Sequence, residues 1–181
     1  MTEQSIISRP TPRPTRTAAV LLGATLLTTG LVAGVYFCFA VAIMPGLADV
    51  DDRTFIDFLQ HVNKRIENPV FFACFFGAPI LGVISIVRTR KLGLTEANRW
   101  IIAGVALAFL GMLITMGGNI PLNNRIEDAG NPAEIADPAK LRDDVENAWI
   151  AWNIARTLAA TAALATLTRA VHILARTTRT P

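Results

Sequence analysis

The chain has 181 residues, 52% of them hydrophobic, with a mean hydropathy of +0.43 and a formal net charge of +3 at pH 7. Four long apolar segments account for this composition and leave too little polar sequence for a separate soluble domain. We therefore expect one membrane domain. The pI of 9.3 requires no nucleic-acid partner, because basic tails beside an apolar segment meet the anionic inner leaflet of the bilayer instead.

The chain begins with a polar tail, residues 1–17, in which prolines alternate with threonine and arginine. Such a composition cannot bury apolar surface, so we expect this cytoplasmic tail to be disordered. The membrane domain, residues 18–175, and a short tail at 176–181 follow it. Each of the four apolar segments in the membrane domain has close to, or more than, the roughly 20 residues that a helix needs to cross a bilayer core. They lie at about residues 18–44, 69–87, 100–118 and 149–175.

Charges in the polar stretches are segregated. Twelve of the 14 acidic residues lie between the first and second segments or between the third and fourth. Basic residues concentrate in the two tails and between the second and third segments. The positive-inside rule then places both termini in the cytoplasm and the two acidic loops outside. The predicted fold is an all-α membrane protein of the cell (plasma) membrane: an antiparallel four-helix transmembrane bundle with two ordered extracytoplasmic loops.

Each acidic loop is expected to contain a helix. The first should run from about Thr54 to Glu67. The second should start at Pro138, because proline suits the first helical position and Asp137 is a suitable N-cap. Within the second apolar segment, Pro79 removes a backbone donor and should kink the helix, and a kink can line a cavity.

Polar and aromatic side chains gather at the outer ends of three segments. Within each group the residues are spaced three or four apart, so they share one side of a helix. The groups reach the same membrane level. They are Gln60, Asn63 and Glu67; Thr115, Asn119 and Asn123; and Trp149, Asn153 and Arg156, with Trp152 beside the last.

Arg156 is the most informative of these residues. It lies about 10 Å below Trp149 along the helix, at or below the membrane interface. An arginine at a helix centre costs about 2.5 to 3.5 kcal/mol on insertion scales, so it usually pairs with another group or lines a wet cavity. The alternative is an interfacial anchor that extends outward along the helix. We favour the inward role, because Asn153 and Trp149 share the stripe.

The sequence predicts neither a metal site nor a cofactor. His61 and His172 lie on opposite membrane faces, and the two cysteines have no metal-binding spacing. His61 is either a general base or a solvated surface histidine. Cys38 and Cys74 fall at comparable depths, where they are either packing residues or a disulfide pair.

Several short motifs resemble the anthrone oxygenase-like family, also described as domain of unknown function 1772. The resemblance covers roughly residues 20 to 170. It is carried by Gly34-Val35-Tyr36-Phe37, Met44-Pro45-Gly46-Leu47, Gln60-His61-Val62-Asn63, Asn68-Pro69, Asn119-Ile120-Pro121-Leu122-Asn123 and Trp152-Asn153-x-x-Arg156-Thr157. Some members are associated with oxidation of anthrones to anthraquinones, and others are uncharacterised.

This resemblance implies a cofactor-independent oxygenase that acts on a lipophilic phenolic or anthrone-like substrate. An anthrone enolate reacts directly with dioxygen, so the protein needs only to bind a flat lipophile, promote ionisation and stabilise an oxyanion. The expected catalytic residues are Arg156, Asn153, His61 and Gln60. The expected substrate-binding residues are Tyr36, Asn63, Asn119, Asn123, Trp149 and Trp152.

Two other hypotheses remain open. The same pocket is suited to hold a quinone, lipid or other lipophile without chemistry, and the outer amides are also suited to a purely structural role. The expected partners are the lipid bilayer and a possible lipophilic aromatic ligand. A homo-oligomer is also possible.

Overall fold

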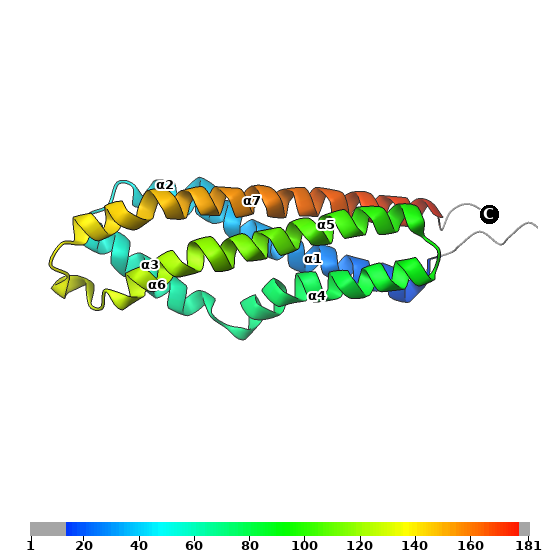
Figure 1. Ribbon diagram of the computed structural model, residues 1–181, viewed down its shortest axis with the longest axis horizontal. Helices are drawn as coiled ribbons and strands as arrows, with labels where there is room; N and C mark the ends of the chain where they lie inside the picture. The colour runs from blue at the N-terminus through cyan, green and yellow to red at the C-terminus, as the bar shows by residue number, and fades with distance from the viewer. Residues whose placement is uncertain (1–13, 178–181) are drawn as a thin grey trace, which may run out of the picture.

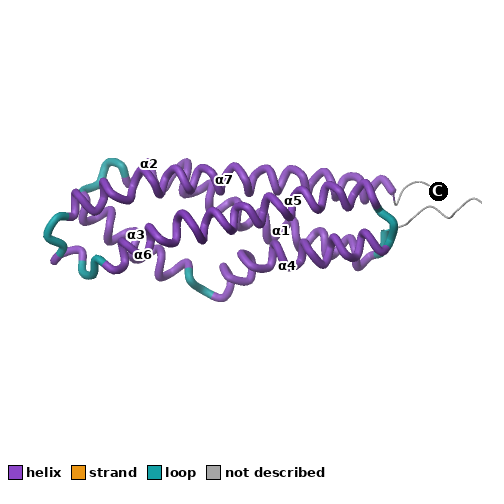
Figure 2. Tube along the Cα trace, viewed as in Figure 1, coloured by secondary structure: helices purple, strands orange, loops and turns teal. Residues whose placement is uncertain are grey.

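The computed structural model describes residues 14–177, which form an elongated bundle of helices lying side by side (Figure 1). These residues contain helices and no strand (Figure 2). The all-helical prediction is therefore confirmed, and so is the number of candidate spans. Most of the predicted N-terminal tail lies outside the described residues. Four helices are long and apolar enough to cross a membrane: Arg16–Leu47, Pro69–Lys91, Thr95–Asp128 and Pro138–Thr177.

Two of the four long helices change helical type part of the way along. The first consists of α1 (Arg16–Cys38), the π-helical turn η1 (Phe39–Ile43) and α2 (Met44–Leu47). The third consists of α5 (Thr95–Ile114), the π-helical turn η2 (Thr115–Asn119) and α6 (Ile120–Asp128). The third helix thus extends ten residues beyond the predicted end of its apolar segment.

The second and fourth long helices begin at capped prolines. In α4 (Pro69–Lys91), the Asn68 side chain accepts hydrogen bonds from the backbone N–H groups of Val70 at 3.0 Å and Phe71 at 3.1 Å. In α7 (Pro138–Thr177), the Asp137 carboxylate accepts from the Lys140 N–H at 2.9 Å. Each proline stands at the first helical position, where a missing N–H is harmless. The predicted helix start at Pro138 is confirmed.

Helix α7 is much longer than a membrane is thick. Its 40 residues span about 60 Å at about 1.5 Å per residue, roughly twice the thickness of a hydrocarbon core. The predicted second cap helix is therefore the beginning of α7 and not a separate element. Between α6 and α7 the structure has only a short 3-10 turn, η3 (Pro132–Glu134).

We call the end of the bundle that carries α3, η3 and the start of α7 the cap end. Helix α3 (Asp52–Ile66) is the predicted helix of the first loop. Its buried Phe55 and Leu59 pack in one apolar cluster with Ile126 of α6 and Val145 and Trp149 of α7. The described ends of the chain lie together at the opposite end of the bundle (Figure 1).

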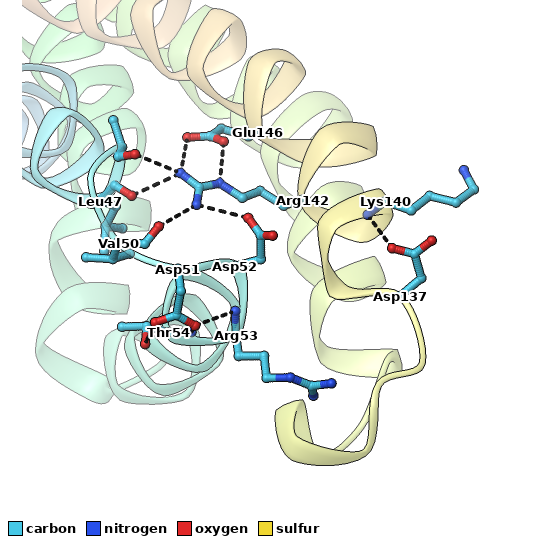
Figure 3. Close-up of polar contacts among 11 residues, drawn as sticks. Leu47, Val50, Asp51, Asp52, Arg53, Thr54, Asp137, Lys140, Arg142 and Glu146 are labelled. Atoms are coloured by element: carbon cyan, nitrogen blue, oxygen red, sulfur yellow. Dashed lines mark hydrogen bonds and ion pairs between the residues drawn. The ribbon is translucent and has the colours of Figure 1, made fainter.

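At the cap end, Arg142 of α7 is hydrogen-bonded both to its own helix and to the chain around Leu47 and Val50 (Figure 3). Its Nε donates to Glu146 Oε2 at 2.7 Å, and its terminal nitrogens donate to the carbonyls of Val50 at 2.8 Å and Leu47 at 3.0 Å. The guanidinium also lies 4.5 Å from the centre of the Phe55 ring. This arginine connects α7 to the segment between α2 and α3 and was not among the residues predicted from the sequence to matter.

Candidate functional site

The two π-helical turns lie toward the cap end of the bundle, and η2 itself contains Thr115 and Asn119. Each is followed by a proline, Pro45 or Pro121, at the start of the next α-helical segment. A proline cannot donate to the carbonyl four residues earlier and clashes with it, so a wider turn relieves the conflict. The Met44 N–H reaches the Phe39 carbonyl and the Ile120 N–H reaches the Thr115 carbonyl, each five residues back. Pro45 and Pro121 thus account for the change from α-helix to π-helix in the first and third long helices.

Arg156 lies inside the bundle, with 7% of the residue exposed. Its Nε donates to Asn153 Oδ1 at 3.0 Å and its Nη1 to Thr115 Oγ1 at 3.4 Å. The guanidinium carbon lies 4.2 Å from the Tyr36 ring centre and 5.3 Å from that of Trp149. Among residues 14–177, no carboxylate lies within ion-pair distance of Arg156. A permanent cation is therefore held by neutral groups and aromatic faces alone.

Hydrogen bonds hold the groups around this cation. Asn153 Nδ2 donates to the Tyr36 carbonyl at 3.2 Å, which joins α7 to α1. The Tyr36 hydroxyl and Thr115 Oγ1 lie 3.1 Å apart, and Thr115 also donates to the Gly111 carbonyl at 2.9 Å. Because α1, α5, η2 and α7 each contribute a group to this network, the position of the guanidinium depends on three of the four long helices.

Asn119 and Asn123 attach the third helix to Trp149. Asn119 Nδ2 donates to the Trp149 carbonyl at 3.1 Å, and the indole Nε1 of Trp149 donates to Asn123 Oδ1 at 2.7 Å. Asn119 is fully buried, and its Oδ1 has no hydrogen-bond partner within the part of the chain that the structure describes. Trp149 is therefore held by the third helix through both its backbone carbonyl and its indole ring.

A cavity of about 110 Å³ opens in front of Arg156, and we call it the arginine cavity. Its polar lining includes Arg156, Thr115 and Asn63, and its apolar lining includes three phenylalanines of α4, Phe71, Phe72 and Phe75. A polar cavity of about 160 Å³ adjoins it and shares Asn63, Glu67 and Asn123 with it. One side of the arginine cavity is thus aromatic and the other side leads to polar groups.

Seven of the ten residues expected at the site are brought together here. Five of them line the arginine cavity, namely Tyr36, Asn63, Asn123, Trp149 and Arg156. Asn153 and Asn119 support that lining from behind.

The structure places Gln60, His61 and Trp152 elsewhere. Gln60 Nε2 donates to the carbonyls of Ile126 and Gly130, both at 2.8 Å, and so connects α3 to the end of α6. The His61 side chain is 72% exposed and pairs with Asp57, four residues earlier. Trp152 is 45% exposed and lies against Gly118 of η2. None of the three lines the arginine cavity.

Glu67 and the phenylalanines of α4 were not among the expected site residues. Glu67 ends α3 and lines both cavities, and it is the one carboxylate in the lining of the arginine cavity formed by the described residues. Phe71 and Phe75 are four residues apart and stack with ring centres 5.7 Å apart. That spacing directly after Asn68-Pro69 is the signal that identifies them in the sequence.

Residues 14–177 contain no group of three or more histidine, cysteine or acidic side chains placed to hold a metal ion. Cys38 and Cys74 are free, and Cys38 is exposed. The donors that converge on the arginine cavity are a guanidinium, amides, a phenol and a hydroxyl. Such groups bind an anion or a polarised carbonyl oxygen.

The fold and the site together define an all-helical four-span membrane protein with a cation in an aromatic cavity. Residues 71–166 match the family described as anthrone oxygenase, which is just over half of the chain. The chain belongs to that family. The matched region contains Thr115, Asn123, Trp149 and Arg156 but not Tyr36 or the residues of α3. No curated protein and no solved structure matches the chain.

Proposed function

We propose that this protein is a cofactor-independent oxygenase that oxidises an anthrone-like or other phenolic lipophile in the arginine cavity. One observation carries the proposal: Arg156 is buried and has no carboxylate partner among residues 14–177. A buried arginine that serves only the fold normally has an anionic partner. An unpaired one supports a negative charge that is brought in or formed during a reaction.

The proposed reaction balances without a cofactor. The substrate methylene loses a proton, which gives an enolate with its charge on the former carbonyl oxygen. Dioxygen adds to the carbon, and the peroxide takes up a proton to give a hydroperoxide. Loss of the second C–H proton, with cleavage of the O–O bond, forms the new carbonyl and releases water. One dioxygen thus converts one CH₂ group to C=O and yields one water.

Each step of this reaction is assigned to a group in the arginine cavity according to its chemistry. Arg156 lies where it stabilises the enolate oxygen, and a fixed donor in a site with little water does so without reorganisation. Glu67 is suited to accept the C–H proton, because its carboxylate forms no hydrogen bond or ion pair within residues 14–177 and adjoins the polar cavity. Water in the polar cavity would then carry the proton away. The aromatic lining holds the rings.

Cavity size restricts how such a substrate binds. A cavity of roughly 150 Å³ holds one benzene ring, whereas the arginine cavity measures about 110 Å³. A three-ring substrate therefore enters with its oxygen-bearing edge first and leaves the other rings at the mouth. Phe72 lines the cavity and is 41% exposed, so this ring marks the opening toward the membrane. This arrangement suits a lipophile that arrives from the bilayer.

The proposed membrane placement is an antiparallel bundle in the plasma membrane with cytoplasmic termini and an external cap end. It is supported by the acidic residues of the cap end and the basic residues of the opposite end. In a background without Cys38 and Cys74, we expect Asp51→Cys and Asp143→Cys to react with a membrane-impermeant thiol reagent on intact cells. Arg90→Cys should react only after permeabilisation. The opposite labelling pattern would invert the topology.

Oxygen uptake tests the oxygenase. The protein in liposomes should consume one dioxygen per anthraquinone formed, at a rate above that of empty liposomes, in which anthrone oxidises spontaneously. His61→Ala should match the wild type, because His61 lies outside the cavity. An aromatic or quinone ligand that co-purifies with a protein giving no uptake above empty liposomes would reject the oxygenase in favour of a lipophile-binding protein.

A further inference from the structure

A second, smaller cavity lies farther from the cap end along the bundle. It measures about 20 Å³ and is lined by ten residues, which come from α1, α4, α5 and α7. Tyr36 and Phe75 line both this cavity and the arginine cavity, so one layer of side chains separates the two. We call it the inner cavity. Its other lining residues include Val32, Ala78, Ala108, Met112 and Ala160.

The inner cavity is poorly suited to water. A buried water typically makes about three hydrogen bonds to polar groups that lack other partners. The polar side chains in this lining already have partners: Thr29 Oγ1 donates to the Thr25 carbonyl at 2.8 Å, and the Tyr36 hydroxyl lies 3.1 Å from Thr115 Oγ1. The volume nevertheless exceeds the roughly 10 to 15 Å³ that one water-sized molecule needs. The cavity therefore suits a small apolar molecule.

We propose that the inner cavity is a dioxygen site that supplies the oxygenase reaction, an inference that rests on the proposed function. Dioxygen is small and apolar, and it dissolves better in the hydrocarbon of a membrane than in water. The reaction consumes it in the arginine cavity, with which the inner cavity shares the Tyr36 and Phe75 rings. The inner cavity holds it directly behind those rings. A path between the two cavities requires one of these rings to rotate.

Xenon and dioxygen kinetics test the site independently. Crystals of the wild-type protein under xenon pressure should show xenon in the inner cavity. Ala78→Val adds two methyl groups to the lining and should remove the xenon. It should also lower kcat/KM for dioxygen by about tenfold or more, as expected for added methyl groups in an apolar pocket, while KM for the anthrone stays unchanged. Ala73→Val makes the same change at an exposed position of α4 and should alter neither.

Ala108→Val on α5 provides a second filling variant should Ala78→Val fail to fold, with the exposed Ala103→Val as its control. Wild-type crystals without xenon in the inner cavity would overturn the inference. So would an active filling variant that excludes xenon but keeps the wild-type dependence on dioxygen. Absence of wild-type turnover would overturn the proposed function and this role together. The xenon measurement distinguishes the cases, because it needs no activity.

Discussion

Replacement of Arg156 is the sharpest test of the proposed chemistry. Arg156→Met keeps an apolar stem and removes the cation from above the Tyr36 ring, together with the bond to Asn153 Oδ1. Loss of one oxyanion donor typically lowers kcat by about 10²- to 10³-fold, or roughly 2.7 to 4 kcal/mol. Arg156→Lys keeps the charge but loses the forked geometry, so its kcat should fall between the two.

Stability should change far less than activity. The Met variant loses two charged hydrogen bonds, to Asn153 and Thr115, and two ring contacts, and it leaves an acceptor on Asn153 without its donor. It also no longer needs to hold a desolvated charge. Each of these effects amounts to a few kcal/mol and they oppose one another. The bundle should therefore still assemble.

Initial rates of oxygen uptake and thermal melting in detergent, measured for the three proteins, separate the two effects. The hypothesis of an interfacial anchor predicts wild-type rates in both variants. A Met variant with wild-type kcat and an unchanged melting temperature would remove Arg156 from the mechanism.

Three further predictions concern the fold. Gly118→Ala should lower the free energy of unfolding by roughly 1 to 3 kcal/mol in equilibrium denaturation, because the new Cβ would lie 2.5 Å from a carbon of the Trp152 indole. Gly117→Ala is the control: its new Cβ meets nothing within 4 Å, so the free energy of unfolding should fall much less. Arg142→Met should lower the stability of the cap end by roughly 2 kcal/mol, between the values for exposed and buried ion pairs. Amide hydrogen exchange should therefore increase at residues 48–52 more than in the long helices, and unchanged exchange there would contradict the prediction. Hydrogen bonds from the Thr54 hydroxyl and N–H lower the pKa of Asp51, so its stabilising contribution is present above its unfolded-state pKa and is lost as pH falls through the folded-state value. Melting from about pH 6 to 2 should therefore be less acid-sensitive in Asp51→Asn, and parallel curves would refute this.

Local sequence determines the spans and their starts. Apolar length defines the four long helices, and short caps such as Asn68-Pro69 and Asp137-Pro138 place their first residues, because these interactions join residues at most three apart. The stripe of Trp149, Asn153 and Arg156 follows from the helical period for the same reason. Five of the ten expected site residues do line one cavity.

Tertiary structure alone decides which side of α3 faces the site. His61 and Glu67 belong to the same amphipathic segment, yet Glu67 lines the arginine cavity and His61 faces outward. Their orientation depends on how α3 packs against α6 and α7, through partners far away in the sequence such as Ile126 for Gln60. The π-helical turn at η2 also changes the register between Thr115 and Asn119. A count of four residues per step assumes a regular α-helix, and only contacts between helices show where that assumption fails.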